Sequence, residues 1–350
     1  MLADIIEFLA CPICREPVTI DRGAVRCGDG HAFDIAKQGY VSLLVGSRVP
    51  GTADSAEMVA ARADFLSTGH FAPLVEAVAE CVDMRITVGR ESAGTAIREK
   101  SFAEPEDGAT AKAYGGPGMD PGHRAEPVGQ VPGDAPRPVI VDAGAGTGHY
   151  LASVLQAVDR SIGVAFDVSK HAVRRAARAH PRLGAFVADV WRPLPIRSGV
   201  ADVVMDVFAP RNSAEFLRVL RPGGAVVVVT PAPAHLSPLV EELGLLSVDE
   251  DKERRLARGM EGFAEVDRRS ITFDMELDRH GVAEVVRMGP SAWHTDPAEL
   301  DERIAAYIAR GTGTTAGATA RAAGNPGKAV ARAAFHLSVF EAAPKSRTIP

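Results

Sequence analysis

The second half of the chain repeats one pattern, in which a short apolar run ends in a polar residue and a helix-like segment follows. The runs are "PVIVDAGAG", "SIGVAFDVS", "LGAFVADVW", "VADVVMDVF" and "AVVVVTPAP". Continuous apolar runs of this length, bounded by turn residues, are typical of strands buried on both faces. Strands that alternate with helices predict a doubly wound, parallel α/β sheet whose polar strand ends gather at the carboxyl edge.

A different pattern occupies the first 50 residues. Val18 and Ile20 alternate with polar residues before a turn at residues 21–23, and Val25 follows the turn. This alternation predicts a β-hairpin. The segment "AFDIAKQGYVSLL" is expected to continue the same small unit as a strand.

Helical spacing begins after Asp54 or Ser55, either of which can cap a helix. The apolar positions that follow with this spacing are Met58, Ala61, Phe65 and Leu66. A break at residues 67–69 precedes a second helix, which is expected from about Phe71 to Val82.

Residues 89–136 change in character, because they are dense in Gly and Pro and nearly empty of large apolar side chains. Such a segment cannot bury enough surface to offset the entropy lost on ordering. It is expected to be a disordered linker or loop. A lid or a partner-binding tail is the functional alternative.

The composition limits the class of protein without fixing its function. In 350 residues, 46% are hydrophobic and 24% are charged, so the chain can build a large core. A net charge of −6 excludes a globally basic coat for nucleic acid but leaves room for a local basic patch. No secretion leader and no apolar run of bilayer length is present, so we expect a cytoplasmic enzyme or binding protein with no membrane partner.

Three of the four cysteines lie close together in the first 31 residues. Their spacing with a histidine is C-x2-C, twelve residues, then C-x3-H, and the residues are Cys11, Cys14, Cys27 and His31. Two such knuckles bound to one tetrahedral ion predict a structural zinc ribbon. The alternative is a chance cluster of buried thiols. Cys81 lies in a helical pattern and is expected to be a core residue.

The glycine-rich turn after the first buried strand is the second candidate site. Gly144, Gly146 and Gly148 let the backbone approach a ligand at a helix N-terminus. Asp142, Asp167 and Asp189 end three successive strands, and the last two are placed for a ribose and for an adenine amino group. Solvated strand-end charge is the simpler explanation for any one aspartate. A dinucleotide oxidoreductase is the rival function, but the third glycine of G-x-G-x-x-G is missing.

The order of these motifs resembles a class I S-adenosylmethionine-dependent methyltransferase. Together with "CPIC", "GHAFDIAKQGYVSLL" and "DSAEMVAARADFLSTGHFAPL", it resembles the zinc-containing guanine-N1 methyltransferases of 23S ribosomal RNA. Members modify a hairpin loop near the peptide exit tunnel, and some confer resistance to macrolides such as tylosin and mycinamicin. A composition typical of a high-GC actinomycete favours the guanine-748 branch over the guanine-745 branch.

The sequence divides into four parts: a zinc ribbon (1–50), a helical connector (51–88), the Gly/Pro-rich linker or loop (89–136) and the methyltransferase domain (137–350). The resemblance covers both ends of the chain and fails only in the Gly/Pro-rich stretch, which the family does not generally have. It implies zinc at the four cysteine and histidine positions. It also implies cofactor contacts from Phe71, from Gly148 and His149, and from His235. Family members often carry Tyr at the position of Phe71, so a hydroxyl hydrogen bond would be lost there and stacking would remain. A homodimer with a joint RNA cleft is the expected assembly.

Basic and aromatic side chains are the candidates for contact with a 23S rRNA hairpin. The basic ones are Arg15, Arg22, Arg26, Lys37 and Arg48, with ordinary solvated charge as the alternative. Phe208 is a candidate for stacking on a base, and Trp191 is either a second one or a core residue. A C-terminal basic stretch from Arg310 to Arg332 is another surface for RNA.

Methyl transfer to guanine N1 also requires removal of a proton, and Asp206 at the end of the fourth strand is the candidate base. Burial beside the strand is the alternative for this carboxylate. Two other functions stay open at this point. One is a small-molecule methyltransferase of a biosynthetic cluster, and the other is a non-catalytic, zinc-dependent RNA-binding protein.

Overall fold

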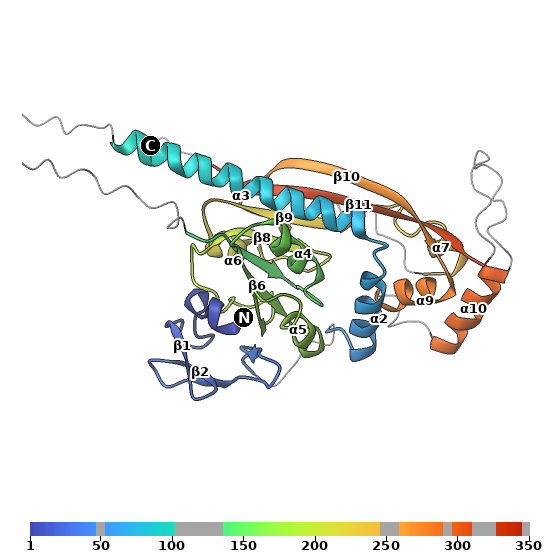
Figure 1. Ribbon diagram of the computed structural model, residues 1–350, viewed down its shortest axis with the longest axis horizontal. Helices are drawn as coiled ribbons and strands as arrows, with labels where there is room; N and C mark the ends of the chain where they lie inside the picture. The colour runs from blue at the N-terminus through green and yellow to red at the C-terminus, as the bar shows by residue number, and fades with distance from the viewer. Residues whose placement is uncertain (47–52, 102–135, 246–258, 290–295, 310–326, 345–350) are drawn as a thin grey trace, which may run out of the picture.

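An eight-stranded sheet runs through the computed structural model, which describes residues 1–46, 53–101, 136–245, 259–289, 296–309 and 327–344 (Figure 1). Its strand order is β10-β11-β9-β8-β5-β6-β7-β4. The strands are β4 (Val41–Ser42), β5 (Val139–Ala143), β6 (Ile162–Asp167), β7 (Leu183–Val187), β8 (Ala201–Val207), β9 (Leu220–Pro231), β10 (Phe263–Leu277) and β11 (Ala329–Ala342). The order reverses between β5 and β8, which places a topological switch point beside the glycine-rich turn.

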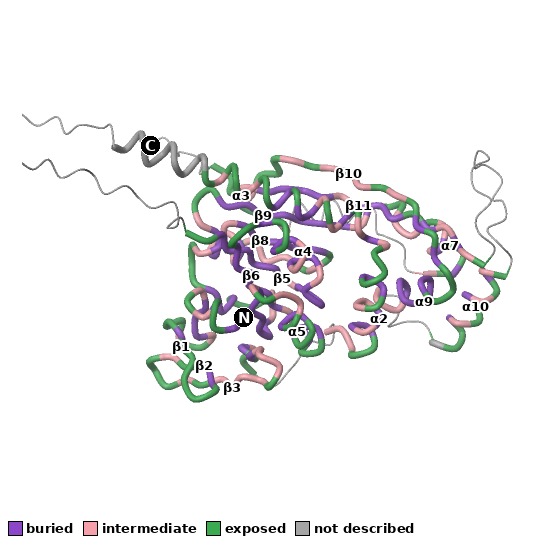
Figure 2. Tube along the Cα trace, viewed as in Figure 1, coloured by how far each residue is buried: buried purple, intermediate pink, exposed green. Residues whose placement is uncertain are grey.

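The sheet is mixed, whereas the sequence predicted a parallel one. Strands β4 to β9 pair in parallel, but β11 pairs antiparallel with both β9 and β10. Strand β11 lies between β9 and β10 and runs in the opposite direction to both. The last two strands therefore do not continue the repeating strand-helix pattern. The central strands are buried on both faces, and β10 alternates between half-buried and exposed residues (Figure 2).

Two hydrophobic cores lie on the two faces of this sheet. One core packs α3 (Ala72–Ser101), α4 (His149–Ala157) and α5 (Lys170–Ala176) against residues such as Ile140. The other packs α1 (Leu2–Ile5), the ribbon and α6 (Ser213–Val219) against Val139 and Val141. The remaining helices are η1 (Ile6–Phe8), α2 (Ala56–Ser67), α7 (Leu239–Glu242), α9 (Arg279–Arg287) and α10 (Pro297–Ala309).

The N-terminal ribbon forms the predicted hairpin. Strand β1 (Val18–Asp21) pairs antiparallel with β2 (Ala24–Cys27), and Arg22 and Gly23 between them have φ values of 47° and 79°. Two central residues with positive φ are typical of a tight hairpin turn. Strand β3 (Ala32–Asp34) pairs with β2. The predicted continuation is confirmed in part, because Val41 forms an isolated antiparallel bridge with Ile35, but Val41–Ser42 also pairs in parallel with β7 at the edge of the large sheet.

The ribbon also shares its apolar core with the sheet. A Cβ on Gly184 of β7 would lie 2.5 Å from Ile5, so the helix α1 occupies the space that this glycine leaves. Leu9 forms an isolated bridge with Ile196, and both side chains are buried. The two predicted domains are therefore joined by packing as well as by the chain.

The helical connector begins as predicted, with the Ser55 side chain accepting a hydrogen bond from the Met58 amide at 3.2 Å. The predicted break is confirmed, since Gly69 has a φ of 78°. The predicted end of the second helix near Val82 is wrong, because α3 continues to Ser101. Gly89, taken as the start of the linker, lies inside this helix where a Cβ would be 3.3 Å from the carbonyl of Gly223. The rest of the predicted linker, residues 102–135, lies outside the described residues.

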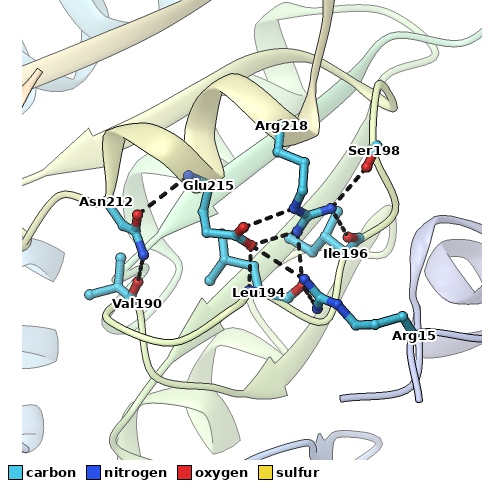
Figure 3. Close-up of polar contacts among 8 residues, drawn as sticks. All are labelled: Arg15, Val190, Leu194, Ile196, Ser198, Asn212, Glu215 and Arg218. Atoms are coloured by element: carbon cyan, nitrogen blue, oxygen red, sulfur yellow. Dashed lines mark hydrogen bonds and ion pairs between the residues drawn. The ribbon is translucent and has the colours of Figure 1, made fainter. Parts of the chain in front are cut away.

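A charged network also holds the ribbon to the large sheet (Figure 3). The Arg15 guanidinium donates to the Leu194 carbonyl at 2.7 Å and lies 3.8 Å from the Glu215 carboxylate. Glu215 accepts two hydrogen bonds from Arg218, at 2.9 and 2.7 Å. Burial alone would raise the pKa of Glu215, but these arginines and the Leu194 amide hold that pKa below its ordinary value. The network therefore depends on an ionised Glu215.

In the part of the chain that the structure describes, no helix has the length and apolar character needed to cross a bilayer.

We expect Glu215→Gln to lower the free energy of unfolding by about 1–3 kcal/mol, because Arg15 and Arg218 lose the charge they share. Glu16→Gln, on an exposed ribbon carboxylate, is the matched control and should have no effect. Urea denaturation at pH 7 measures both variants. Equal midpoints for E215Q and the wild-type protein would contradict the docking role of the network.

Candidate functional site

The four predicted metal ligands converge at the base of the ribbon. Their ligand atoms all lie within 4.8 Å of one another. Cys14 Sγ is 3.6 Å from Cys27 Sγ, and His31 Nδ1 is 3.3 Å from Cys27 Sγ and 3.7 Å from Cys11 Sγ. A zinc ion with ordinary bond lengths would place two sulfurs about 3.8 Å apart, and a sulfur and a nitrogen about 3.6 Å apart. The donor set and its spacing therefore fit one tetrahedral zinc ion.

Local backbone geometry builds this site. The Arg15 amide bonds to the Cys11 carbonyl at 3.0 Å, and the Gly30 amide bonds to the Cys27 carbonyl at 3.2 Å. Arg15 and Gly30 both have positive φ, at 69° and 85°, which turns each knuckle back on itself. Four protein ligands leave no open position, so the ion is structural. Cys81 lies apart from the site and is a buried core residue, as predicted.

The glycine-rich turn is packed tightly by the protein itself. Gly144, Gly146 and Gly148 have φ values of 72°, 53° and 77°. A Cβ on Gly144 would lie 2.5 Å from Ala209, and one on Gly148 would lie 3.0 Å from Ala176. At two of these three positions, packing against neighbouring residues therefore requires glycine whether or not a ligand binds.

Asp167 organises this turn from the end of β6. Its carboxylate accepts the Gly146 amide at 2.9 Å and the Ser169 amide at 2.8 Å. Burial raises the pKa of Asp167, and the two amides offset part of that rise. Each carboxylate oxygen retains acceptor capacity, so Asp167 can still accept a ribose hydroxyl.

Two buried carboxylates lie at the switch point between β5 and β8. Burial, with a smaller effect of the Asp167 charge, raises the pKa of Asp142 from 3.8 to about 7. Asp206 is 0% exposed, and burial raises its pKa well above the ordinary value, although Arg211 opposes the rise. Its carboxylate lies 3.2 Å from Arg211 Nε. Asp206 therefore lies in the core in this structure, which favours the alternative of burial beside the strand over a role as the base.

Helix α2 contributes a side chain that the sequence reasoning did not single out. Arg62 Nη1 would lie 3.5 Å from a Cβ on Gly146, and Nη2 donates to the Met288 carbonyl at 3.0 Å. Arg62 also forms an ion pair with Asp54, whose carbonyl accepts from Ser169 Oγ at 2.8 Å. The connector therefore crosses over the glycine-rich turn. The sequence signal was present in "DSAEMVAAR", but only folding brings it to this turn.

The aromatic candidates form one cluster beside the carboxyl edge. Phe71 is 2% exposed, and its ring centroid lies 5.2 Å from that of Phe335 and 6.2 Å from that of His235. The Phe208 ring lies 5.5 Å from the Phe335 ring and is 43% exposed at a φ of 60°. Phe71 is thus a core residue here, and Phe208 presents a surface for stacking.

The other expected cofactor contacts lie at the same edge. His149 is the first residue of α4, where burial lowers its pKa. Asp189 follows β7 and accepts the Trp191 amide at 3.0 Å while pairing with Arg192 at 3.6 Å. Trp191 is 66% exposed, so it is a surface residue and not part of the core.

The predicted RNA contacts divide into three groups. Arg15 already has partners within the protein, because its guanidinium donates to the Leu194 carbonyl and lies beside Glu215, although its side chain is 39% exposed. Arg22, Arg26 and Lys37 are exposed on the ribbon, and the two arginines pair only at 4.0 and 3.8 Å with Asp21. Arg48, and residues 310–326 of the C-terminal basic stretch, lie outside the described residues.

We expect Cys14→Ser to abolish stoichiometric zinc binding and to unfold the ribbon, because bound metal supplies much of the folding free energy of such a unit. Cys81→Ala removes a thiol outside the cluster and should retain one zinc per chain. Elemental analysis of the purified proteins measures this. A wild-type protein without stoichiometric metal would rule out the ribbon site.

Asp142→Asn should raise stability at pH 7 in the protein without cofactor. The raised pKa means that native Asp142 binds a proton which the unfolded chain has released, so stability falls as pH rises from about 4 to about 7. Removing the charge abolishes this decrease, which is on the order of 4 kcal/mol. Urea titrations at pH 4 and pH 8 test it. Parallel pH profiles for D142N and wild type would contradict it.

Comparisons with known proteins match both parts of the chain. A zinc-ribbon family model described as "RlmA, N-terminal" matches residues 9–46, and one described as "Methyltransferase domain" matches residues 140–224. A solved S-adenosyl-L-homocysteine complex of a methyltransferase from Geobacter sulfurreducens covers 59% of this chain and 86% of its own, with 16% identity and a TM-score of 0.35.

Curated relatives extend over most of the chain. A Micromonospora griseorubida protein named "Putative 23S rRNA (guanine-N(1)-)-methyltransferase" is 44% identical over 92% of this chain and 99% of its own. The "23S rRNA (guanine(748)-N(1))-methyltransferase" of Streptomyces fradiae is 42% identical over 87% of this chain and 92% of its own. The similarity spans the ribbon, the connector and the sheet, and the chain therefore belongs to the 23S rRNA (guanine-N1)-methyltransferase family.

Proposed function

We propose that this enzyme transfers a methyl group from S-adenosylmethionine to N1 of a guanine in a hairpin loop of 23S rRNA, at the guanine-748 position. The observation that carries the proposal is the zinc ribbon, which is fixed by a shared core beside a sheet edge that carries a glycine-rich turn. The 42% identity to the Streptomyces fradiae enzyme, whose name specifies guanine 748, supports the choice of nucleotide.

The residues at the carboxyl edge fit the proposed cofactor. Asp167 would accept ribose hydroxyls, Asp189 would accept the adenine amino group, and the ionised Asp142 would attract the positive charge of the cofactor. His149, His235 and Phe71 are further proposed contacts, and in this structure Phe71 is buried with its ring centroid 6.2 Å from that of His235. When bound, the cofactor supplies a methyl group that its sulfonium already activates.

The chain's own part in the reaction is mainly to position the guanine. Phe208 would stack on the flipped base and hold its N1 toward the bound cofactor, which would supply the methyl group. The proton on N1 leaves to solvent, because Asp206 is buried against Arg211. A protein of this kind would work on ribosomal RNA in the cytoplasm, with two copies forming the RNA cleft.

The direct test incubates the purified protein with a 23S rRNA hairpin and labelled S-adenosylmethionine, followed by mass mapping of the product. We expect one methyl group on N1 of a single loop guanine. Transfer only to small molecules would favour the biosynthetic methyltransferase, and RNA binding without turnover would favour the non-catalytic alternative. Reduced macrolide sensitivity of cells that express the gene would extend the proposal to drug resistance.

The exposed ribbon arginines give a second test of RNA recognition. Arg22→Ala with Arg26→Ala should weaken hairpin binding and reduce the slope of log affinity against log salt, by about one unit for each phosphate that the variant no longer neutralises. Zinc content and cofactor affinity should not change. The matched control replaces both by Lys and should keep the wild-type slope. An unchanged slope in the Ala variant would move RNA recognition away from the ribbon.

A further inference from the structure

A cavity of about 160 Å³ opens where the ribbon meets the large sheet. Three segments form its walls: Pro12 in the first zinc knuckle, residues 43–45 after β4, and the loop that follows β7. That loop contributes Ala188, Asp189 and Arg192. No residue of the glycine-rich turn or of β6 lines the cavity. It therefore lies beside the proposed cofactor site and shares with it the end of β7.

Exposed apolar residues lie in the three segments that form the walls of this cavity. Within the described residues, Trp191 is 66% exposed, Ile13 is 51% exposed and Val45 is 39% exposed. Val45 lines the cavity, and the other two are sequence neighbours of lining residues. A single exposed apolar residue is ordinary, but a group from three separate segments around one opening indicates a binding surface.

The charged groups that line the cavity are one carboxylate and one guanidinium. Asp189 and Arg192 both line the cavity, and their charged groups lie 3.6 Å apart, whereas Arg197 in the same loop donates to the Glu7 carbonyl at 3.0 Å. Arg192 Nη1 donates to the Val45 carbonyl at 2.6 Å, which fixes the guanidinium against the wall. Half of that side chain, 50%, remains exposed. A guanidinium held in this way can stack on a base or contact a phosphate.

We propose that this cavity binds one unpaired nucleobase of the RNA hairpin loop, a base that flanks the guanine to be methylated. This inference rests on the proposed function. The volume is below the roughly 300–1,000 Å³ of sites for drug-sized ligands, which suits a single ring. Proline and leucine side chains would contact the faces of the base, Arg192 its polar edge, and Trp191 would stack at the opening.

The location explains how two bases of one loop are held together. Ala188 and Asp189 follow β7, and the glycine-rich turn follows β5 at the same carboxyl edge. A loop that delivers its guanine to this edge therefore passes the junction with the ribbon. Capture of a neighbouring base there would fix the register of the loop and so select which guanine is methylated.

Tryptophan fluorescence tests the proposal directly. The chain has two tryptophans, so Trp293→Phe leaves Trp191 as the sole reporter. Titration with the 23S rRNA hairpin should quench Trp191, whereas a fully paired RNA of equal length and charge should not. Hairpins with single abasic sites in the loop should identify one flanking position whose removal abolishes the quench. Because the titration needs no turnover, it decides the proposal even if the methylation assay fails.

Variants on the exposed rim provide the second readout. Trp191→Ala removes the stacking surface, and Val45→Phe blocks the opening. Each variant should raise the KM for the hairpin about ten-fold and leave kcat and cofactor affinity unchanged. Trp191→Phe keeps an aromatic face and should restore most of the affinity. Weaker cofactor binding by both rim variants would assign the cavity to the cofactor and overturn the proposal. Unchanged fluorescence with bound hairpin would also overturn it.

Discussion

The placement of the ribbon against the sheet is the constraint on which the rest of this structure depends. Ile5 fills the space above Gly184, and Leu9 bridges to Ile196, so the N-terminal segment is part of one core of the sheet. Arg15 adds a polar contact to Leu194 and Glu215 at the rim. A zinc site without an open position cannot do chemistry, but it can hold a small unit in one shape. The ribbon thus becomes a fixed wall beside the carboxyl edge.

The buried carboxylates at the carboxyl edge favour the binding of a cation there. Asp142 and Asp206 are buried at the switch point, and burial raises the pKa of both. Such carboxylates destabilise the protein at neutral pH unless a positive charge approaches them. The Arg211 guanidinium supplies this positive charge beside Asp206, and a cationic cofactor would supply it beside Asp142. Stability at this edge is therefore coupled to occupancy of the proposed cofactor site, as linkage requires.

Local features were predictable from the sequence, and long-range contacts were not. The zinc ligands and the hairpin turn follow from spacing within a few residues, and the positive φ of the three loop glycines fits their sequence context. Arg15 looks in sequence like an RNA contact, because nothing local shows that Leu194 and Glu215 meet it after folding. The end of α3 was missed for a similar reason. Gly89 normally weakens a helix, but here it allows close approach to Gly223.

We infer that the ribbon and the loop after β7, residues 188–198, form one rigid RNA-binding wall. Amide hydrogen exchange of the zinc-loaded protein, with and without the 23S rRNA hairpin, tests it most directly. We expect added protection in residues 18–27 and 188–198, with ribbon and sheet core protected alike before RNA is added. Protection confined to β10 and β11, with the ribbon exchanging freely in the complex, would contradict it.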